Sequence, residues 1–160
     1  MEDHKDLLDL DSFLPYRLAV IAARVSKSMS VLYAEKFGIS IAEWRVIAHL
    51  ARSGRVSIRD IHARVNLDKV KVSRAVSRLE EAGLVLKASN AADNRLLDIT
   101  LSDEGWSVYR QIVPLASGFE ADLLSVLDEA ERAALERIFE KLHSRLDDNP
   151  DMPRRALPAP

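Results

Sequence analysis

The chain begins with a long stretch in which apolar residues recur at helical spacing. From Ser12 to Phe37 they fall at steps of three, four and seven, which marks one side of an amphipathic helix. This apolar stripe contains Leu14, Leu18, Ile21, Val25 and Leu32. We expect Ser12 to cap the helix, Pro15 to be tolerated in its first turn, and Gly38 to end it.

Polar caps and glycines divide the next region into shorter helices. Ser40 and Glu43 have the spacing of a capping box, and the apolar run that follows them ends at Gly54. Ser57 is placed to cap a third helix, and Asp68 to cap a fourth. The third and fourth helices, separated by a short turn, have the outline of a helix-turn-helix.

Two β-like runs follow the fourth helix. The runs LVLKAS and RLLDITL are joined by the polar segment NAADN, as in a hairpin. In the second run, Leu97, Ile99 and Leu101 alternate with a set that includes Asp98 and Thr100. Helix, turn, basic helix and hairpin, in this order, predict a winged helix-turn-helix, which is a DNA-reading module.

Two further helices are expected after the hairpin. Ser102 is placed to cap the first, and Pro114 lies well inside it, where it should kink or divide the helix. Asp128 and Glu131 form a second capping box at the start of the last helix. The tail from Asp147 holds four of the six prolines and has no apolar periodicity, so we expect it to be disordered.

These elements predict a mainly α fold with a small β-hairpin wing. We expect a flexible acidic start (1–11), a winged helix-turn-helix DNA-binding domain (40–101), a helical dimerisation region (12–39 and 102–146) and the tail (147–160). The first and last helices carry more apolar surface than the core of one small domain can cover. This favours a homodimer in which the terminal helices of two copies intertwine. The alternative is that these helices fold back on their own domain. A two-fold axis would present two reading helices to a palindromic site.

The charge is segregated along the chain. Residues 52–95 hold ten Lys and Arg against five acidic residues, a net charge of +5, whereas the whole chain has a net charge of −2. The remainder is therefore at −7, and an acidic protein with one basic region favours an anionic polymer such as double-stranded DNA on that face. A uniformly solvated charged surface does not explain this segregation.

The fourth helix has two distinct faces at 100° per residue. The face expected to pack on the core holds Val72, Ala75, Val76, Leu79 and Gly83. The opposite face holds Val70, Arg74, Ser77 and Glu81. Val70 suits contact with a thymine methyl group, and Arg74 suits bidentate recognition of guanine. We expect phosphate contacts from Lys69, Lys71, Ser73 and Arg78.

The tip of the hairpin carries Asp93 and Arg95 two positions apart. Arg95 is suited to a narrow, A·T-rich minor groove, where negative potential is concentrated. Asp93 can hold its guanidinium through a charge-assisted hydrogen bond. The alternative is a salt bridge that is only structural.

Several other classes of protein are disfavoured. There is no cysteine, no glycine-rich phosphate loop and no nucleophile elbow, so we expect neither an enzyme nor a cofactor. No apolar run reaches the length of a membrane span and the acidic start is unlike a signal peptide, so we expect a cytoplasmic protein. A metal-responsive regulator is disfavoured because the four histidines lack ligand spacing. A winged helix that binds protein remains an alternative.

Four motifs occur along residues 12–146 in a characteristic order: ISIAEWRVIAHL, LDKVKVSRAVSRLEEAGLV, Asp93 and Arg95 in the wing, and ITLSDEGW. In these motifs and their spacing the chain resembles the MarR family of bacterial winged-helix regulators. This resemblance implies a triangular dimer that binds a palindromic operator, usually as a repressor, and is released by a small ligand, often phenolic or aromatic. The chain departs from the family where Val70 and Lys71 replace small hydroxyl residues, which affects the operator sequence, and where Ala91 replaces a proline.

The resemblance also implies a ligand site between the dimer helices and the DNA-binding lobe. Its expected lining is Tyr16, Arg17, Trp44, His49, Trp106 and Tyr109. Aromatic rings would stack on the ligand, and Arg17 would bind a carboxylate. The alternative is that Trp44 and Trp106 are core residues and that Arg17 is an ordinary solvated residue.

Overall fold

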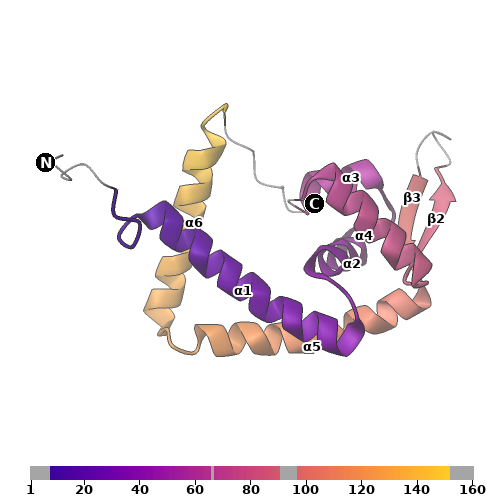
Figure 1. Ribbon diagram of the computed structural model, residues 1–160, viewed down its shortest axis with the longest axis horizontal. Helices are drawn as coiled ribbons and strands as arrows, with labels where there is room; N and C mark the ends of the chain where they lie inside the picture. The colour runs from indigo at the N-terminus through magenta and orange to yellow at the C-terminus, as the bar shows by residue number, and fades with distance from the viewer. Residues whose placement is uncertain (1–7, 66, 91–96, 152–160) are drawn as a thin grey trace, which may run out of the picture. The chain divides into compact units, whose positions relative to one another are not determined.

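The computed structural model describes residues 8–65, 67–90 and 97–151 of a chain that forms two compact units, 1–41 and 42–160. Figure 1 shows the elements along the chain. The helices are α1 (Leu14–Phe37), α2 (Ile41–Ser53), α3 (Ile58–Arg64), α4 (Lys69–Glu81), α5 (Asp103–Leu124) and α6 (Glu129–Asp147). The strands are β1 (Val56–Ser57), β2 (Val85–Ser89) and β3 (Leu97–Leu101). The structure confirms the prediction of a mainly helical fold with a small β-sheet.

The first unit contains α1. Gly38 ends this helix in the left-handed conformation, with φ of 65°, as predicted. The prediction that Ser12 caps it is wrong, because the N-cap position is Phe13 and no side chain caps the helix. The Ser12 hydroxyl instead donates to the Asp9 carbonyl at 3.2 Å, and the Phe13 N–H donates to the same carbonyl at 3.1 Å. A separate turn before the helix therefore engages the Ser12 hydroxyl.

The predicted caps of α3, α4, α5 and α6 are all confirmed. Each capping side chain accepts a hydrogen bond from the backbone N–H three residues later, which satisfies one of the unpaired donors of a helix start. The capping residues are Ser57, Asp68, Ser102 and Asp128. The capping box of Asp128 and Glu131 is present in full.

The core of the second unit is built from α2, α3, α4, the sheet and α5. Its fully buried side chains include Ile47, Leu50, Ile61, Val72, Val76, Leu79, Ile99 and Ile112. The predicted inner face of α4 is confirmed for Val72, Ala75, Val76 and Leu79. The prediction is wrong for Gly83, which is exposed, lies beyond the end of α4 and has a φ of 72°. It ends the helix instead of packing on the core.

The sheet has three antiparallel strands in the order β1-β3-β2, so β3 is central. The predicted hairpin is confirmed, with Val85 opposite Leu101 and Ser89 opposite Leu97. Strand β1 pairs with the other edge of β3 through Val56 and Ile99. A strand of two residues is too short to give an alternating pattern, which is why the sequence does not indicate it.

Helix α5 starts in close contact with the turn that follows α4. The Ser102 N–H donates to the Leu84 carbonyl at 3.1 Å, and the Ser102 hydroxyl donates to the Gly83 carbonyl at 2.6 Å. Gly105 is buried at this contact, where an added Cβ would lie 2.1 Å from the Leu84 carbonyl oxygen. Only glycine fits the space that this backbone contact leaves.

Pro114 does not divide α5, which runs unbroken from Asp103 to Leu124, so the expectation of a division is wrong. Proline removes the hydrogen bond to the carbonyl of Arg110, four residues earlier. Both residues are exposed, so water can bond to that carbonyl and the helix can continue. Within the described ranges, no helix is long and apolar enough to span a membrane.

Candidate nucleic-acid interface

The outer face of α4 gathers the residues predicted to contact DNA. Its side chains Lys69, Val70, Lys71, Ser73, Arg74 and Arg78 are exposed, and Ser77 is half-buried. Val70 is 58% exposed, although the other face of the same helix is fully buried. Apolar exposure next to exposed cations leaves Val70 available for contact with a partner such as a thymine methyl group.

Two of the cations on α4 are paired with acidic residues. The Lys71 ammonium lies 3.0 Å from the carboxylate of Asp68, the residue that caps α4. The backbone N–H of Lys71 also donates to Asp68, and this hydrogen bond, with help from the Lys71 ammonium, lowers the pKa of the carboxyl. Among the described residues, no carboxylate lies within 4 Å of the head groups of Lys69 or Arg74. Within this part of the chain, no acidic partner therefore offsets the charges of these two side chains.

The second pair links α4 to α2. The Arg78 guanidinium lies 3.8 Å from the Glu43 carboxylate, and Glu43 is only 5% exposed. A buried carboxylate is stable only when it is paired or hydrogen-bonded. Helical periodicity indicates a capping role for Glu43 but gives no sign of this contact, because Arg78 is 35 positions away in the sequence.

The hairpin is held by side chains that the sequence pattern does not single out. Lys87 on β2 donates to the Glu80 carboxylate near the end of α4. Asp98, which alternation places on the polar side of β3, is buried. Asp93 and Arg95 lie outside the described residues, so their predicted minor-groove roles stay predictions.

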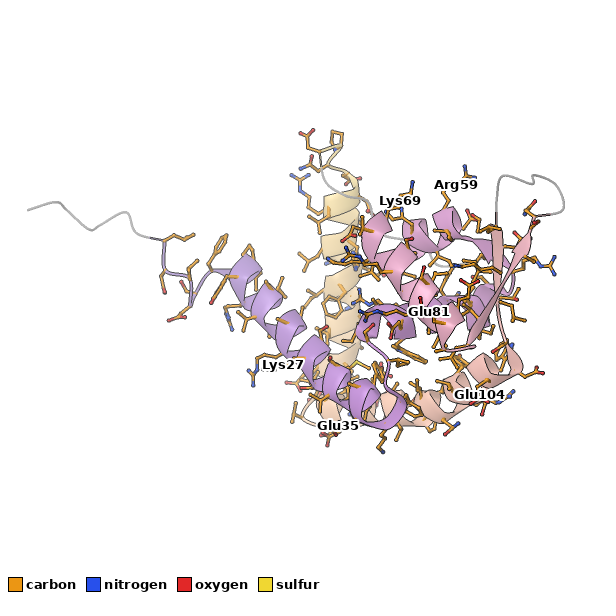
Figure 2. The ribbon with its side chains drawn as sticks, turned by 45° about the vertical axis from the view of Figure 1, so that its right-hand side comes forward. Lys27, Glu35, Arg59, Lys69, Glu81 and Glu104 are labelled. Atoms are coloured by element: carbon orange, nitrogen blue, oxygen red, sulfur yellow. The ribbon has the colours of Figure 1, made fainter. Side chains whose placement is uncertain are left out.

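Arg59 is a further exposed cation near α4. It belongs to α3, and Figure 2 shows it at the same end of the second unit as Lys69. No carboxylate of the described residues lies within 4 Å of its guanidinium. The count of basic residues between 52 and 95 includes Arg59, but helical periodicity alone assigns it no role.

Three of the residues predicted to bind a ligand form an aromatic cluster between α2 and α5. Trp44 stacks on Tyr109 with ring centroids 5.8 Å apart, and Trp106 meets Tyr109 edge-on at 5.7 Å. All three are half-buried, so the tryptophans are not fully enclosed core residues. Stacked and edge-on rings of this kind also stabilise packing between helices without any ligand.

The other predicted ligand residues are placed differently. Nδ1 of His49 lies 3.5 Å from the Ser53 hydroxyl, one turn further along α2. Tyr16 and Arg17 are exposed on the first turn of α1, which belongs to the other unit. Their participation in the site stays a prediction. In the described ranges there is no group of three or more His, Asp or Glu that could hold a metal ion.

Comparison with known proteins identifies the family. The sequence model of the MarR family matches residues 37–96. The HTH-type transcriptional repressor MdtR of Bacillus subtilis is 30% identical over 108 residues, which are 68% of this chain and 70% of MdtR. The chain therefore belongs to the MarR family.

Solved structures of MarR proteins have the same fold. A MarR/EmrR family regulator from Acinetobacter sp. ADP1 superimposes with a TM-score of 0.80 at 30% identity, over 89% of this chain and 100% of that one. The MarR family regulator Sco3205 of Streptomyces coelicolor, solved in complex with DNA, gives a TM-score of 0.79 at 22% identity, over 96% and 99% of the two chains. The family and the winged-helix fold expected from the sequence are thus confirmed. MarR proteins are transcriptional regulators and not enzymes.

Proposed function

We propose that this MarR protein is a homodimeric, sequence-specific repressor that a small aromatic ligand releases from DNA. The observation that carries the proposal is the outer face of α4, where Lys69 and Arg74, which have no acidic partner among the described residues, lie beside the exposed Val70. A helix with this combination matches the major groove, which offers phosphates, guanine acceptor atoms and thymine methyl groups.

Each residue on this face has a proposed role. Arg74 recognises a guanine through two hydrogen bonds, and Val70 contacts a thymine methyl. Lys69, Lys71, Ser73 and Arg78 bind phosphates, and Ser77 borders the groove. The likeness to the repressor MdtR supports a regulator that binds DNA, and Sco3205, which has the same fold, was solved in complex with DNA.

The dimer is supported by apolar surface on the terminal helices. Helix α6 has no buried residue within the described chain. It exposes Ile138, Phe139, Leu142 and Leu146. On α1, Leu14, Leu18 and Ile21 are exposed at helical spacing. A second copy of the chain can cover such faces across a two-fold axis, and the operator is then palindromic.

The aromatic cluster supports a planar ligand. Trp44, Trp106 and Tyr109 provide ring faces and edges on which an aromatic acid can stack. Tryptophan fluorescence reports on binding directly. A panel of aromatic acids should quench it and should weaken DNA binding at the same concentrations, and Tyr109→Leu should reduce both effects. If no acid changes fluorescence or DNA affinity, this part of the proposal is wrong.

The central test is a selection of binding sites from a random duplex library, followed by fluorescence anisotropy on the selected and scrambled duplexes over a salt series. We expect enrichment of a palindrome and a steep decrease of affinity with salt. Sedimentation should show a dimer at micromolar concentration. If no sequence is enriched and binding is weak on every duplex, the repressor assignment is wrong, and the winged helix that binds protein becomes the better interpretation.

A further inference from the structure

A buried carboxylate lies at the base of the wing. Asp98, in the central strand β3, is 6% exposed. Its Oδ1 accepts a hydrogen bond of 2.7 Å from the side-chain amide of Asn90, which follows the end of β2. Its Oδ2 lies 3.9 Å from the guanidinium of Arg55, which precedes β1. Asp98 thus joins all three strands at one point.

The two contacts explain why an acidic residue is stable at this position. Burial of a carboxylate is unfavourable unless both oxygens find partners. Here, one oxygen has a neutral donor and the other has a positive charge. An apolar residue would suit this buried position equally well and would need neither partner. The carboxylate is therefore suited to holding Asn90 and Arg55 in place.

The guanidinium of Arg55 stays accessible to a second anion although it lies next to Asp98. The side chain of Arg55 is 66% exposed, whereas that of Asp98 is 7% exposed. A guanidinium has five N–H donors, and at 3.9 Å the carboxylate engages the group mainly by charge. No other carboxylate of the described residues lies within 4 Å of the guanidinium, so Arg55 can bind a second anion without leaving Asp98.

The position of Arg55 in the wing suggests what that anion is. In the sequence, Asn90 and Asp98 flank the segment 91–97, which leads from β2 into β3, and Arg95 precedes Asp98 by three residues. Three residues span roughly 11 Å at most. The minor groove is about 6 Å wide and is bordered by phosphates. If Arg95 enters the minor groove, as the sequence predicts, a side chain next to Asp98 lies near enough to contact a phosphate that borders the groove.

We propose that Arg55 is a further DNA-binding residue, which contacts a phosphate beside the minor groove, and that Asp98 is its positioning residue. This inference rests on the proposed function and on the predicted entry of the wing into the minor groove, and it extends DNA binding to a residue outside α4. The phosphate contact adds affinity without sequence preference. Because Asp98 positions Arg55, the phosphate contact depends on the contacts of Asp98 with Arg55 and Asn90.

The first test compares Arg55→Ala with Arg55→Lys on the selected and the scrambled duplex. Arg55→Ala should weaken binding to both duplexes about three- to tenfold and should reduce the salt slope by about one. Arg55→Lys should restore most of the slope, because the charge is kept. Lys69→Ala serves as a reference for a phosphate contact, and Arg110→Ala, an exposed arginine on α5, as a control for the loss of one charge.

The second test is a double-mutant cycle with Asp98→Asn. Asparagine keeps an oxygen for Asn90 but removes the charge that holds Arg55. If Asp98 positions Arg55, Arg55→Ala should weaken binding less than about twofold in the Asp98→Asn background. Urea unfolding of each variant separates this effect from a loss of stability. A positioning role changes the coupling in DNA binding, whereas a merely structural role changes only the unfolding curve.

The outcomes distinguish this inference from the proposed function. If Lys69→Ala reduces the salt slope and Arg55→Ala does not, the role of Arg55 is wrong and the repressor assignment stands. If Arg55→Ala weakens DNA binding equally in the wild-type and in the Asp98→Asn background, the positioning role of Asp98 is refuted. If the wild type selects no sequence at all, the proposed function itself fails.

Discussion

The guanidinium of Arg78 on α4 lies 3.8 Å from the buried carboxylate of Glu43 on α2. This pair places a negative charge behind a cation on the face that we assign to DNA. The carboxylate offsets part of the positive charge that Arg78 presents to a phosphate. The contact thus fixes α4 relative to α2 and also limits how strongly α4 attracts DNA.

Glu43→Gln should strengthen DNA binding. The substitution keeps the shape of the side chain but removes the charge that offsets Arg78, so we expect a several-fold increase in affinity and a salt slope that is steeper by up to about one. The free energy of unfolding should change by about 1 kcal/mol or less, because the Arg78 side chain stays solvated. Anisotropy over a salt series measures the first effect, and urea unfolding the second.

The matched control is Glu81→Gln, at the other end of α4 from Lys69 (Figure 2). It removes the same charge but releases no arginine, because among the described residues no cation lies within 4 Å of the Glu81 carboxylate. Its effect on the salt slope should be smaller. Equal slopes for the two variants would mean that the Glu43 contact does not restrain Arg78.

Substitutions along α4 should separate recognition from simple attraction. Arg74→Ala should cost about 1–3 kcal/mol on the selected duplex and relax the preference at one base pair. Lys69→Ala should weaken binding to all duplexes alike. Lys71→Ala should reduce the salt slope less than Lys69→Ala, because Asp68 already balances Lys71. Anisotropy on single-base variants of the selected site tests all three.

If Arg74→Ala and Lys69→Ala have identical effects on every duplex, the division of roles on α4 is wrong. A larger slope change for Lys71→Ala than for Lys69→Ala would show that Asp68 releases Lys71 when DNA binds.

The cap of α4 should make stability depend on pH. The hydrogen bond from the backbone N–H of Lys71 lowers the pKa of Asp68 below its usual value. A carboxyl with a lowered pKa stabilises the fold above its unfolded pKa, and this contribution is lost as the pH falls through the folded value. The wild type should therefore lose its advantage over Asp68→Asn below about pH 4.

Urea unfolding of the two proteins between pH 7 and pH 3 measures this difference. Asparagine is also a good capping residue but does not titrate, so it isolates the effect of the charge. A constant difference across this range would contradict the role given to the Asp68 carboxylate.

Two glycines of α5 should respond in opposite ways to alanine. Gly105→Ala places a Cβ 2.1 Å from the Leu84 carbonyl oxygen, so we expect a loss of stability of about 1–3 kcal/mol or more. An added Cβ at Gly118 meets no atom within 4 Å in the described part of the chain. Gly118→Ala should therefore stabilise the protein by about 0.5–1 kcal/mol, as expected for an exposed helix position. Thermal unfolding compares the stability of the two variants. If both are less stable than the wild type, helix propensity does not decide the effect of Gly118→Ala.

Features that depend on residues within one or a few helical turns were predicted most reliably from the sequence. The caps at Ser57, Asp68, Ser102 and Asp128 act within one turn, so their spacing alone predicts them. The inner face of α4 follows from helical periodicity for the same reason. Ser12 was mispredicted because the turn before α1 competes for its hydroxyl.

Contacts between distant segments were not predictable in this way. Alternation assigns Asp98 to the polar side of β3, and only the folded chain brings Arg55 and Asn90 to it. The pairing of Glu43 with Arg78 likewise depends on how α2 packs on α4. Trp44 and Tyr109 were expected at one site only through the family resemblance, and their stacking shows that α2 and α5 bring them together.

The strand order β1-β3-β2 has a consequence for the synthesis of the protein. The central strand is the last of the three to be made, and Val56 must wait for Ile99, which lies 43 residues later. Until Leu101 has left the ribosome, both outer strands lack the backbone partner that completes them. The helix-turn-helix can form its local turns earlier, but the sheet can form only after β3 has been made. A nascent chain that stalls within the wing would carry a basic helix without the sheet that supports it.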